Sequence, residues 1–260
     1  QQFVTTNPRV LKNSEKLEAL RERMKNALEA ENLEEIKQII IDEEIADPVS
    51  GSRNWTDVRQ FNLMFDTRLG SLNDESNKVY LRPETAQGIF VNYLNVQKTG
   101  RMKIPFGIAQ IGKAFRNEIT TKQFIFRTRE FEQMEMQYFV SPEKEEAEYQ
   151  KLKDFRWEFY KQLGLKEENL RWKQHDNLVF YAKNAYDIEY KYDFGFKELE
   201  GVHARGDYDL GQHSKFSGQD LKYTDPKTNE TYLPHIIESS VGVGRIFLAV
   251  LQDAYQEEDT

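Results

Sequence analysis

The most constraining feature of the sequence is a pair of extended segments, residues 105–116 and 128–140, joined by a short turn. The stretch from Phe115 to Phe139 contains three arginines and four glutamates among aromatic residues. Successive side chains of a strand point to opposite faces, so strands that only covered a core would alternate apolar and polar residues. These charges exceed what core packing needs. The segments therefore predict an antiparallel hairpin that carries a site for an anionic ligand beside an aromatic surface.

Alternation assigns the side chains of the second segment to two faces. One face would carry Arg129, Phe131, Gln133 and Glu135, and the other Glu130, Glu132, Met134 and Met136. Arg116 and Glu118 would share a face of the partner segment. Arginine can bind a phosphate through two parallel hydrogen bonds, an aromatic ring can stack on a base, and a glutamate suits an ammonium group. The alternative is an exposed sheet crossed by salt bridges, and composition alone does not separate the two.

Length and composition limit the class of protein. The 260 residues suffice for one large domain or two modest ones. The net charge of −8 argues against a surface that is basic overall and binds nucleic acid all over, but it permits a local basic patch. The chain has no cysteine, and its four histidines lack metal-ligand spacing, so we expect no zinc site. No apolar run is long enough to span a membrane and no signal peptide is visible. We therefore expect a cytoplasmic protein without a membrane partner.

The remaining pattern predicts a lead-in helical segment over residues 1–46 and a larger domain over 47–260. An apolar stripe predicts a helix over 14–30, and Asn32 with Glu35 predicts a capping box that opens a second one. Further extended segments are expected at 59–69, 79–82, 186–193, 199–204 and 234–238, and further helices at 85–94, 141–164 and 241–255. Residues 211–231 are expected to be a polar loop. Hairpins with helices between them predict an α+β fold with an antiparallel sheet.

A second motif lies at residues 238–245, Glu-Ser-Ser-Val-Gly-Val-Gly-Arg, between a short strand and a helix. Small residues at such a turn permit close backbone approach, and a helix N-terminus favours anions, so Arg245 could reach a phosphate. Taken alone, the segment is more commonly an ordinary glycine-rich helix start. It also lacks the third glycine of the dinucleotide-binding fingerprint.

A third motif is Arg-Pro-Glu-Thr-Ala-Gln-Gly at residues 82–88. Thr85 could simply cap the following helix, with Glu84 complementing the helix dipole. Alternatively, Glu84 supplies a second carboxylate for the ammonium group that Glu135 would bind.

Together the three motifs resemble those of class II aminoacyl-tRNA synthetases, and specifically the homodimeric glycyl-tRNA synthetases. Phe115-Arg116-Asn117-Glu118 with Phe126-Arg127-Thr128-Arg129-Glu130-Phe131 resembles motif 2 of that class, and residues 237–245 resemble motif 3. Residues 82–88 resemble the signature of the glycine enzymes, and residues 186–190 and 197–201 also match. The similarity runs from about residue 47 to 255.

The resemblance implies an antiparallel sheet flanked by helices, and a role in protein biosynthesis. Glycine would attack the α-phosphate of ATP to form glycyl-adenylate, and the glycyl group would then pass to the 3′ end of tRNA(Gly). ATP and Mg²⁺ are the implied cofactors. Selection of glycine would depend on excluding larger amino acids, because a hydrophobic slot gains only ~1–3 kcal/mol per methylene.

The resemblance also implies residue roles. Arg116 and Arg245 would be catalytic, with Arg116 on the α-phosphate, and Arg205 would meet the terminal phosphates. ATP would be bound by Arg116, Asn117, Glu118, Phe126, Arg127, Thr128, Arg129, Glu130, Phe131, Glu198, Leu199, Arg205, Gly242, Val243, Gly244 and Arg245. Glycine would be bound by Glu84, Phe131, Glu132, Gln133, Met134, Glu135, Glu238, Ser239, Ser240, Val241 and Gly242. Glu198 and Glu238 are the candidates for Mg²⁺.

The sequence also departs from the family pattern. It shows no match to motif 1, which forms the dimer interface, and none to the C-terminal anticodon-binding domain. It does not begin with Met, and His203 and Ala204 before Arg205 are unusual for the family. We therefore expect the inner catalytic core of a longer homodimeric enzyme, weak or inactive by itself.

Two competing functions remain open at this point. One is a catalytically silent, synthetase-like protein that binds nucleic acid or serves as an accessory factor. Such relatives usually lose the arginines that bind ATP, whereas Arg116, Arg129 and Arg245 are all present. The other is an amide ligase of the same fold, which would leave residues 82–88 unexplained.

Overall fold

The computed structural model describes residues 14–47, 50–59, 61–70, 75–175 and 184–258. The chain forms two compact units, Gln1–Asn62 and Leu63–Thr260. Among the described residues, no helix combines the length and the apolar character needed to cross a membrane.

The first unit contains helices α3 (Ser14–Glu29) and α4 (Leu33–Asp42). The Asn32 side chain accepts a hydrogen bond from the Glu35 backbone N–H at 3.1 Å, which confirms the predicted N-cap, whereas the Glu35 carboxylate binds Arg23. A small apolar core joins the two helices and includes Leu20, Met24, Ala27, Ile36, Ile39 and Ile45. Val58 packs against this core and Trp55 donates to the Ile45 carbonyl oxygen. Residues beyond Ala46 therefore belong to this unit, and the division follows Asn62 instead.

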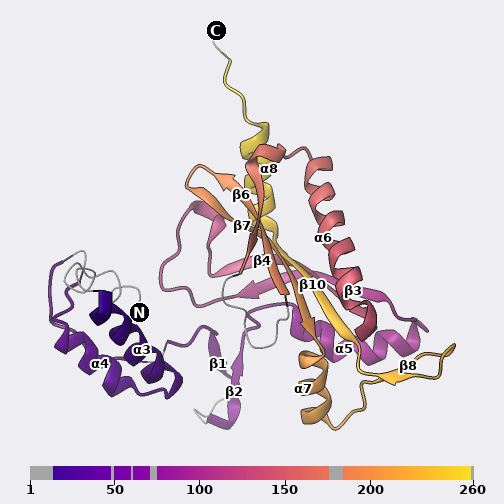
Figure 1. Cartoon of the computed structure of the whole chain (residues 1–260), viewed down its shortest axis with the longest axis horizontal. Coiled ribbons are helices and arrows are strands. Elements are labelled where there is room, and N and C mark those ends of the chain that lie inside the picture. The colour runs from indigo at the N-terminus through magenta and orange to yellow at the C-terminus, as the bar shows by residue number, and fades with distance from the viewer. Residues whose placement is uncertain (1–13, 48–49, 60, 71–74, 176–183, 259–260) are drawn as a thin grey trace. The chain divides into compact units, whose positions relative to one another are not determined.

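The second unit is built on a six-stranded sheet with the order β3-β4-β10-β7-β6-β5 (Figure 1). Its strands are β3 (Phe106–Phe115), β4 (Glu130–Val140), β5 (Leu170–Gln174), β6 (Asn184–Tyr192), β7 (Gly195–Gly206) and β10 (His235–Gly242). Every neighbouring pair is antiparallel. The predicted α+β fold with an antiparallel sheet is confirmed. The hairpin predicted from residues 105–116 and 128–140 corresponds to β3 and β4.

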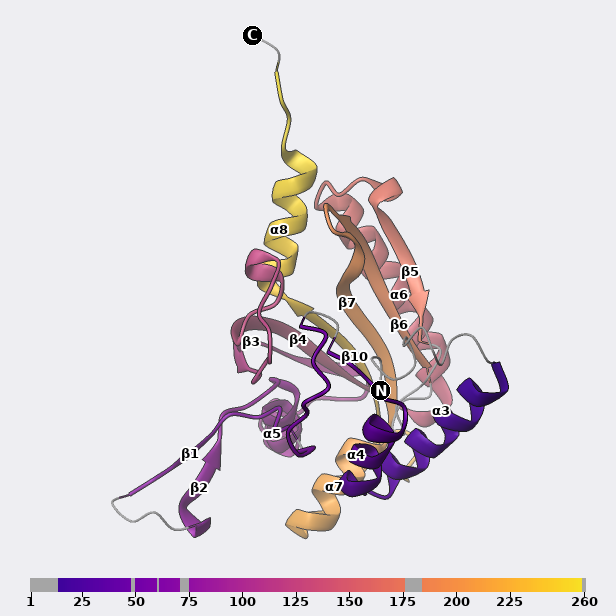
Figure 2. The ribbon, with the colours of Figure 1, turned by 90° about the vertical axis from the view of Figure 1, so that its left-hand side faces the viewer.

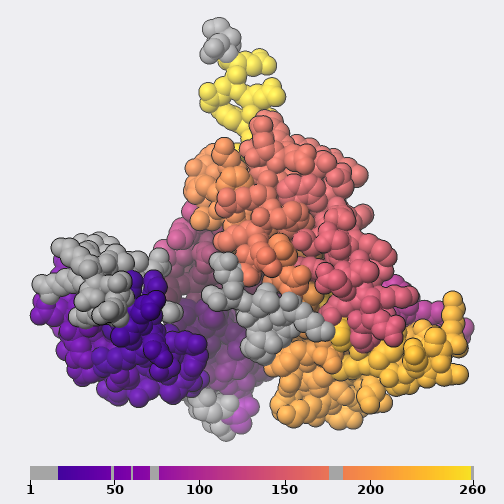
Figure 3. Space-filling model, viewed as in Figure 1, coloured from indigo at the N-terminus to yellow at the C-terminus, as the bar shows by residue number. Residues whose placement is uncertain are grey.

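Helices cover both faces of this sheet (Figure 2). They are α5 (Ala86–Thr99), α6 (Glu145–Gln162), α7 (Tyr208–Ser217) and α8 (Val243–Ala254). We call the face that carries Gln133, Glu135 and Gln137 the α5 face, because Thr85, the N-cap residue of α5, bonds to it. The opposite face, where α6 contacts Glu200, is the α6 face, and α6 forms much of the surface on that side (Figure 3).

Short elements complete the second unit. They are β1 (Asp66–Arg68), β2 (Lys78–Tyr80), β8 (Tyr223–Thr224) and β9 (Thr231–Tyr232), with 3₁₀ turns at Glu75–Asn77, Phe124–Phe126, Pro142–Lys144 and Glu167–Asn169. Apolar packing under α5 unites helix and sheet, since Tyr93 lies 4.7 Å from Phe139 between ring centroids.

Several elements differ from the sequence-based expectation. The extended segment predicted at 59–69 is a strand only over Asp66–Arg68 among its described residues, and β8 and β9 lie in or at the end of the predicted loop at 211–231. Helix α7 occupies part of the predicted loop at 211–231. The sequence did not predict it, because its residues are mostly polar and only Asp209 and Leu210 are buried, so no apolar periodicity is visible. Strand β5 was not predicted. Strand β10 continues to Gly242 rather than ending at Glu238, since its polar residues find partners on the neighbouring strands.

Candidate active site

A cavity of about 80 Å³ opens where the β3–β4 hairpin meets the start of α8. It is lined by Arg116, Glu118, Ile125, Phe126, Arg127, Thr128, Phe131, Gln133, Glu198, Ser240, Gly242, Gly244 and Arg245. We call it the arginine cavity. It brings together twelve residues that the sequence assigned to ATP or glycine, from segments more than a hundred positions apart, and adds Ile125.

Arg116 is placed just beyond the end of β3. Its Nε donates to the Pro83 carbonyl oxygen at 3.0 Å, and its guanidinium carbon lies 5.3 Å from the centre of the Phe131 ring. The backbone contact and the ring fix the orientation of an exposed guanidinium. A flat group and a phosphate could therefore be bound side by side.

Arg245 enters the cavity from the first turn of α8. Its Nη1 donates to the Glu198 carbonyl oxygen at 3.0 Å, and its guanidinium lies 4.3 Å from the Phe126 ring centre. Gly244 allows the helix to approach the hairpin, since a Cβ there would lie 3.2 Å from the Ile125 carbonyl oxygen. The glycine at this position therefore has a packing reason.

Arg127 supplies the third guanidinium. Its Nη1 pairs with Glu118 at 3.3 Å, while its buried Nε has no hydrogen-bond partner in the described part of the chain. A buried donor without a partner costs about 1–3 kcal/mol. An anionic ligand in the cavity would satisfy it.

A cluster of buried polar groups lies next to the cavity on the α5 face. Glu135, 2% exposed, accepts hydrogen bonds from the Thr85 backbone N–H at 3.1 Å and from the Thr85 hydroxyl. Ser240 lies opposite it in register and accepts from Gln133 at 2.8 Å. Thr85 is the N-cap residue of α5, but its side chain makes no capping hydrogen bond, and its hydroxyl donates to Glu135 instead.

The environment of Glu135 is unfavourable to its negative charge. Burial, followed by the nearby carboxylates of Glu238 and Glu84, raises the pKa of Glu135 to about 8. Within the described residues, the groups that donate hydrogen bonds to Glu135 are neutral, and they belong to Thr85 and Gln137. This carboxylate would therefore gain from the arrival of a cation.

Glu238 has the opposite electrostatic environment. Burial alone would raise its pKa, but the hydrogen bond from His203 and the charge of Arg205 hold the pKa of this carboxyl well below its usual range. Arg205 donates to Glu238 at 2.7 Å and binds Asp209 with two hydrogen bonds. The structure thus places Arg205 in the interior of the α5 face, outside the arginine cavity. Gln137 connects the two environments by donating to both Glu135 and Glu238.

The two magnesium candidates are not brought together. Glu238 lies opposite His203, so Glu198 is five residues further along β7, roughly 16 Å away at ~3.3 Å per residue. Because Mg²⁺ binds oxygen at about 2.1 Å, one ion cannot bind both carboxylates. Glu198 lines the arginine cavity, whereas Glu238 does not.

Several other predicted site residues lie elsewhere. Glu132, Met134, Ser239 and Val241 alternate onto the α6 face, and Leu199 is fully buried in the core. Arg129 donates to the carbonyl oxygens of Glu118 and Ile119, Glu130 pairs with Lys113, and Asn117 donates to the Leu63 carbonyl oxygen. Sequence reasoning missed Gln137, although its alternation with Gln133 and Glu135 would have placed it on the same face.

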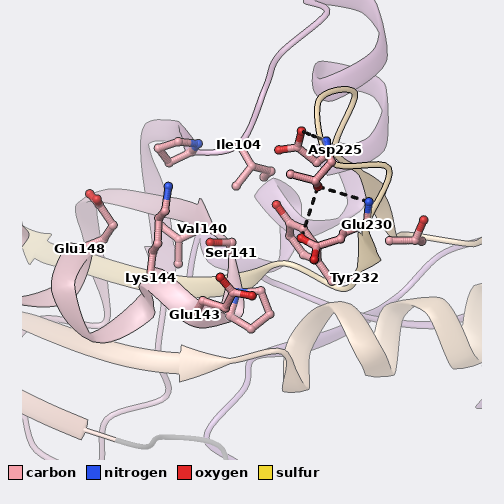
Figure 4. A pocket seen from close by; sticks show the side chains of 13 residues that line it. Ile104, Val140, Ser141, Glu143, Lys144, Glu148, Asp225, Glu230 and Tyr232 are labelled. Carbon is pink, nitrogen blue, oxygen red and sulfur yellow. Dashed lines mark hydrogen bonds between the residues drawn. The ribbon is translucent and has the colours of Figure 1, made fainter.

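A larger cavity of about 450 Å³ lies at the opposite end of β4 (Figure 4). The charged residues that line it are Glu143, Lys144, Glu148, Asp225 and Glu230. This acidic lining would repel a nucleotide. The smaller arginine cavity is therefore the better candidate despite its size.

Comparison with known proteins agrees with this architecture. Residues 65–255 match the tRNA synthetase class II core domain (G, H, P, S and T), so the chain belongs to this family. Residues 1–63 match glycyl-tRNA synthetase insertion domain 1. A solved structure of Giardia lamblia prolyl-tRNA synthetase with prolyl-adenylate shares the fold, with a TM-score of 0.57 and 18% identity over 73% of this chain and 37% of that one.

Relatives named glycine--tRNA ligase are much more similar in sequence. That of Chlorobaculum tepidum is 54% identical over 85% of this chain and 47% of its own length. That of Staphylococcus haemolyticus is 56% identical over 87% of this chain and 50% of its own length, and that of Treponema denticola is 58% identical over 78% and 46%. The chain spans about half the length of these relatives.

Proposed function

We propose that this chain is the catalytic core of a glycine--tRNA ligase, which activates glycine with ATP and transfers it to tRNA(Gly). The observation that carries the proposal is the junction of two environments. The arginine cavity suits the phosphates and base of a nucleotide, and the adjoining Glu135 cluster suits a small ammonium group. The similarity to ligases of that name supports the choice of glycine.

The geometry fits a reaction that needs alignment more than acid–base chemistry. The carboxylate of glycine is itself the nucleophile, so the protein has to bring two anions together and stabilise charge at the α-phosphorus. Arg116 would bind the α-phosphate and hold the base against Phe131. Arg245 would stabilise the departing pyrophosphate or flank the adenine.

Glycine would be oriented by its ammonium group. Glu135, Glu84 and Ser240 are its proposed partners, and arrival of the cation would favour the ionised form of Glu135. Gln133 already binds Ser240 and accepts from Thr85, so little space remains for a side chain on the Cα. Exclusion of alanine would follow from overlap with these packed groups.

The other parts of the assignment are proposals as well. Mg²⁺ would offset phosphate charge, and Glu198 is the better placed carboxylate since it lines the cavity. The homodimer and the cytoplasmic location follow from the proposed activity.

Glycine-dependent exchange of labelled pyrophosphate into ATP by the natural full-length protein tests the proposed reaction directly. We expect exchange with glycine and at least 100-fold less with alanine, since a pocket without room for a methyl group rejects it sterically. Absence of exchange with glycine, or equal exchange with both amino acids, would overturn the assignment.

Binding of ATP to this chain tests the arginine cavity separately. Arg116→Ala should weaken binding about 10- to 100-fold, because hydrogen bonds to charged groups contribute about 1.5–3 kcal/mol. Arg171→Ala is the matched control, since Arg171 also lies over a phenylalanine ring, that of Phe196, but outside the cavity. Equal affinities for the two variants would remove Arg116 from the site.

A further inference from the structure

Two histidines that are distant in sequence meet an aspartate on the α5 face of the sheet. His175 follows β5, Asp187 lies on β6 and His203 on β7. One ligand atom from each lies within 4.8 Å of the others. Asp187 is centrally placed, since its Oδ2 is 2.8 Å from His175 Nε2 and its Oδ1 is 3.5 Å from His203 Nε2.

The two Nε2 atoms have ion-pair contacts to Asp187 but lack hydrogen bonds to it. Both are buried, and neither makes a hydrogen bond of acceptable geometry within the described ranges, despite their closeness to Asp187. Two buried imidazole nitrogens that converge on one carboxylate without hydrogen bonds form a set of donors that a metal ion would satisfy.

The groups behind His203 fix its ring. Its Nδ1 lies 3.2 Å from the Glu238 carboxylate, so that bond can hold the proton on Nδ1 and leave Nε2 as a ligand. Metal-binding histidines generally have such a carboxylate or carbonyl partner on their other nitrogen. Gly201 provides the space, because a Cβ there would lie 2.9 Å from His203 Cε1 and 3.0 Å from Nε2.

We propose that His175, Asp187 and His203 form a binding site for a divalent transition-metal ion, Zn²⁺ foremost, that ties the ends of β5, β6 and β7 together. Two imidazoles and a carboxylate without thiolates form a donor set that suits Zn²⁺ and Co²⁺ better than Mg²⁺. A water molecule completes four-coordination. The site has a structural role, and it is separate from the Mg²⁺ proposed for the arginine cavity.

The geometry requires only a small adjustment. Ligand atoms about 2.0–2.1 Å from a tetrahedral Zn²⁺ are roughly 3.4 Å apart. The ligand atoms lie at most 4.8 Å apart, so a shift of about 1.4 Å in His175, which lies beyond the end of the edge strand β5, would bring them to this spacing. The expectation that this chain lacks a zinc site rested on missing cysteines and on histidine spacing, neither of which describes residues that meet across strands.

The competing explanation is an ionic cluster without a metal. In that case a protonated His203 would bridge Asp187 and Glu238. Burial alone would lower the pKa of His203, but the close carboxylates of Asp187 and Glu238 raise it to about 9. A metal ion and this proton would occupy the same nitrogen, so direct measurement of binding separates the two explanations.

The test is metal binding to the chain after treatment with a chelator. Zn²⁺ is titrated calorimetrically, bound metal is counted by mass spectrometry after gel filtration, and Co²⁺ is followed through its visible absorption. We expect one equivalent of Zn²⁺ and a Co²⁺ spectrum typical of nitrogen and oxygen ligands in four-coordination. His175→Ala and His203→Gln should each weaken Zn²⁺ binding at least 10-fold.

His213→Ala is the matched control, because His213 bonds to Gln87 on a different part of the fold and its loss should leave binding unchanged. His175→Ala is the variant less prone to misfold, because His175 lies just beyond the end of β5. Circular dichroism checks that His175→Ala and His203→Gln are both folded. The proposal fails if the wild type binds no stoichiometric Zn²⁺. It also fails if His175→Ala binds as well as wild type, or if His213→Ala loses binding to the same degree.

Discussion

Two buried glutamates on opposite faces of the same sheet have contrasting surroundings. Glu200, on the α6 face, is fully buried and receives two hydrogen bonds from Arg156 at 2.7 and 2.9 Å, with further bonds from Tyr160 and Ser239. Glu135, on the α5 face, is equally inaccessible but is bonded by neutral groups and lies near other carboxylates.

The difference separates a carboxylate that folding has paired from one that suits the proposed ammonium site. A buried charge is tolerated when a matched partner and hydrogen bonds surround it, as they do for Glu200. Glu135 lacks a cationic partner of this kind within the described residues. Its raised pKa reflects the free energy needed to bury its negative charge. An acidic group that folding leaves in this condition is suited to receive a cationic ligand. The contrast therefore supports the proposed ammonium site without reference to any relative.

The largest expected effect comes from removing Arg156, the cationic partner of the buried Glu200. Arg156→Met should lower the free energy of unfolding by about 3–5 kcal/mol, because Glu200 would keep a buried charge without its partner. Urea denaturation at neutral pH measures this. Adding Glu200→Gln to the same chain removes the orphaned charge and should recover at least about 1 kcal/mol. A loss below about 1 kcal/mol for Arg156→Met would show that the two faces do not differ as described.

The second prediction concerns the effect of Glu135 on how stability depends on pH. Below the ordinary glutamate pKa of 4.5, folded and unfolded chains both carry the proton on Glu135. Between pH 4.5 and about 8 the unfolded chain has released this proton while the folded chain still holds it, so stability falls as the pH rises. The loss should amount to a few kcal/mol at this buried position.

Glu135→Gln should abolish this part of the pH dependence. Urea midpoints measured from pH 5 to 8 for the variant and wild type give the difference in slope. Glu132→Gln is the matched control, since Glu132 is an exposed carboxylate on the same strand. Parallel curves for Glu135→Gln and wild type would contradict the raised pKa. Glycine-dependent pyrophosphate exchange by the full-length protein should nevertheless decrease in Glu135→Gln, because the neutral amide pairs poorly with an ammonium group.

The smallest effect is expected at the surface of the same hairpin. Lys113 and Glu130 form an exposed cross-strand ion pair. Lys113→Ala should change the free energy of unfolding by less than about 1 kcal/mol, because exposed pairs contribute little. The same urea experiment measures it. A larger effect would revive the interpretation that the charges of the hairpin serve mainly to hold the sheet together.

Much of the hairpin was predictable from local pattern. Alternation correctly put Gln133 and Glu135 on one face and Met134 and Met136 on the other, because the period of a strand is a property of the backbone. The same rule argues against Met134 and Glu132 as partners of glycine. Helix α7 escaped prediction, because its sequence has little amphipathic pattern and its few buried residues depend on tertiary contacts.

The candidate site was only partly readable in the sequence. Arg116 and Arg245 were found through motifs, and the structure brings both into one cavity. Arg205 was expected to meet the terminal phosphates of ATP, but in the structure it binds Asp209 and Glu238 in the interior. Spacing along the chain does not reveal which acidic group an arginine will meet.

By itself the sequence determined the antiparallel hairpin, the alternation of its faces and the resemblance to class II synthetases, because these depend on short-range periodicity and contiguous motifs. Only the tertiary structure decided which carboxylates are paired. Glu200 and Glu135 are the same residue type in similarly polar strands, and their difference comes from Arg156 on α6 and Glu238 on β10. The meeting of His175 and His203 was likewise decided by strand pairing. Such partners are distant in sequence, and the free energy of a buried charge depends on what surrounds it in space.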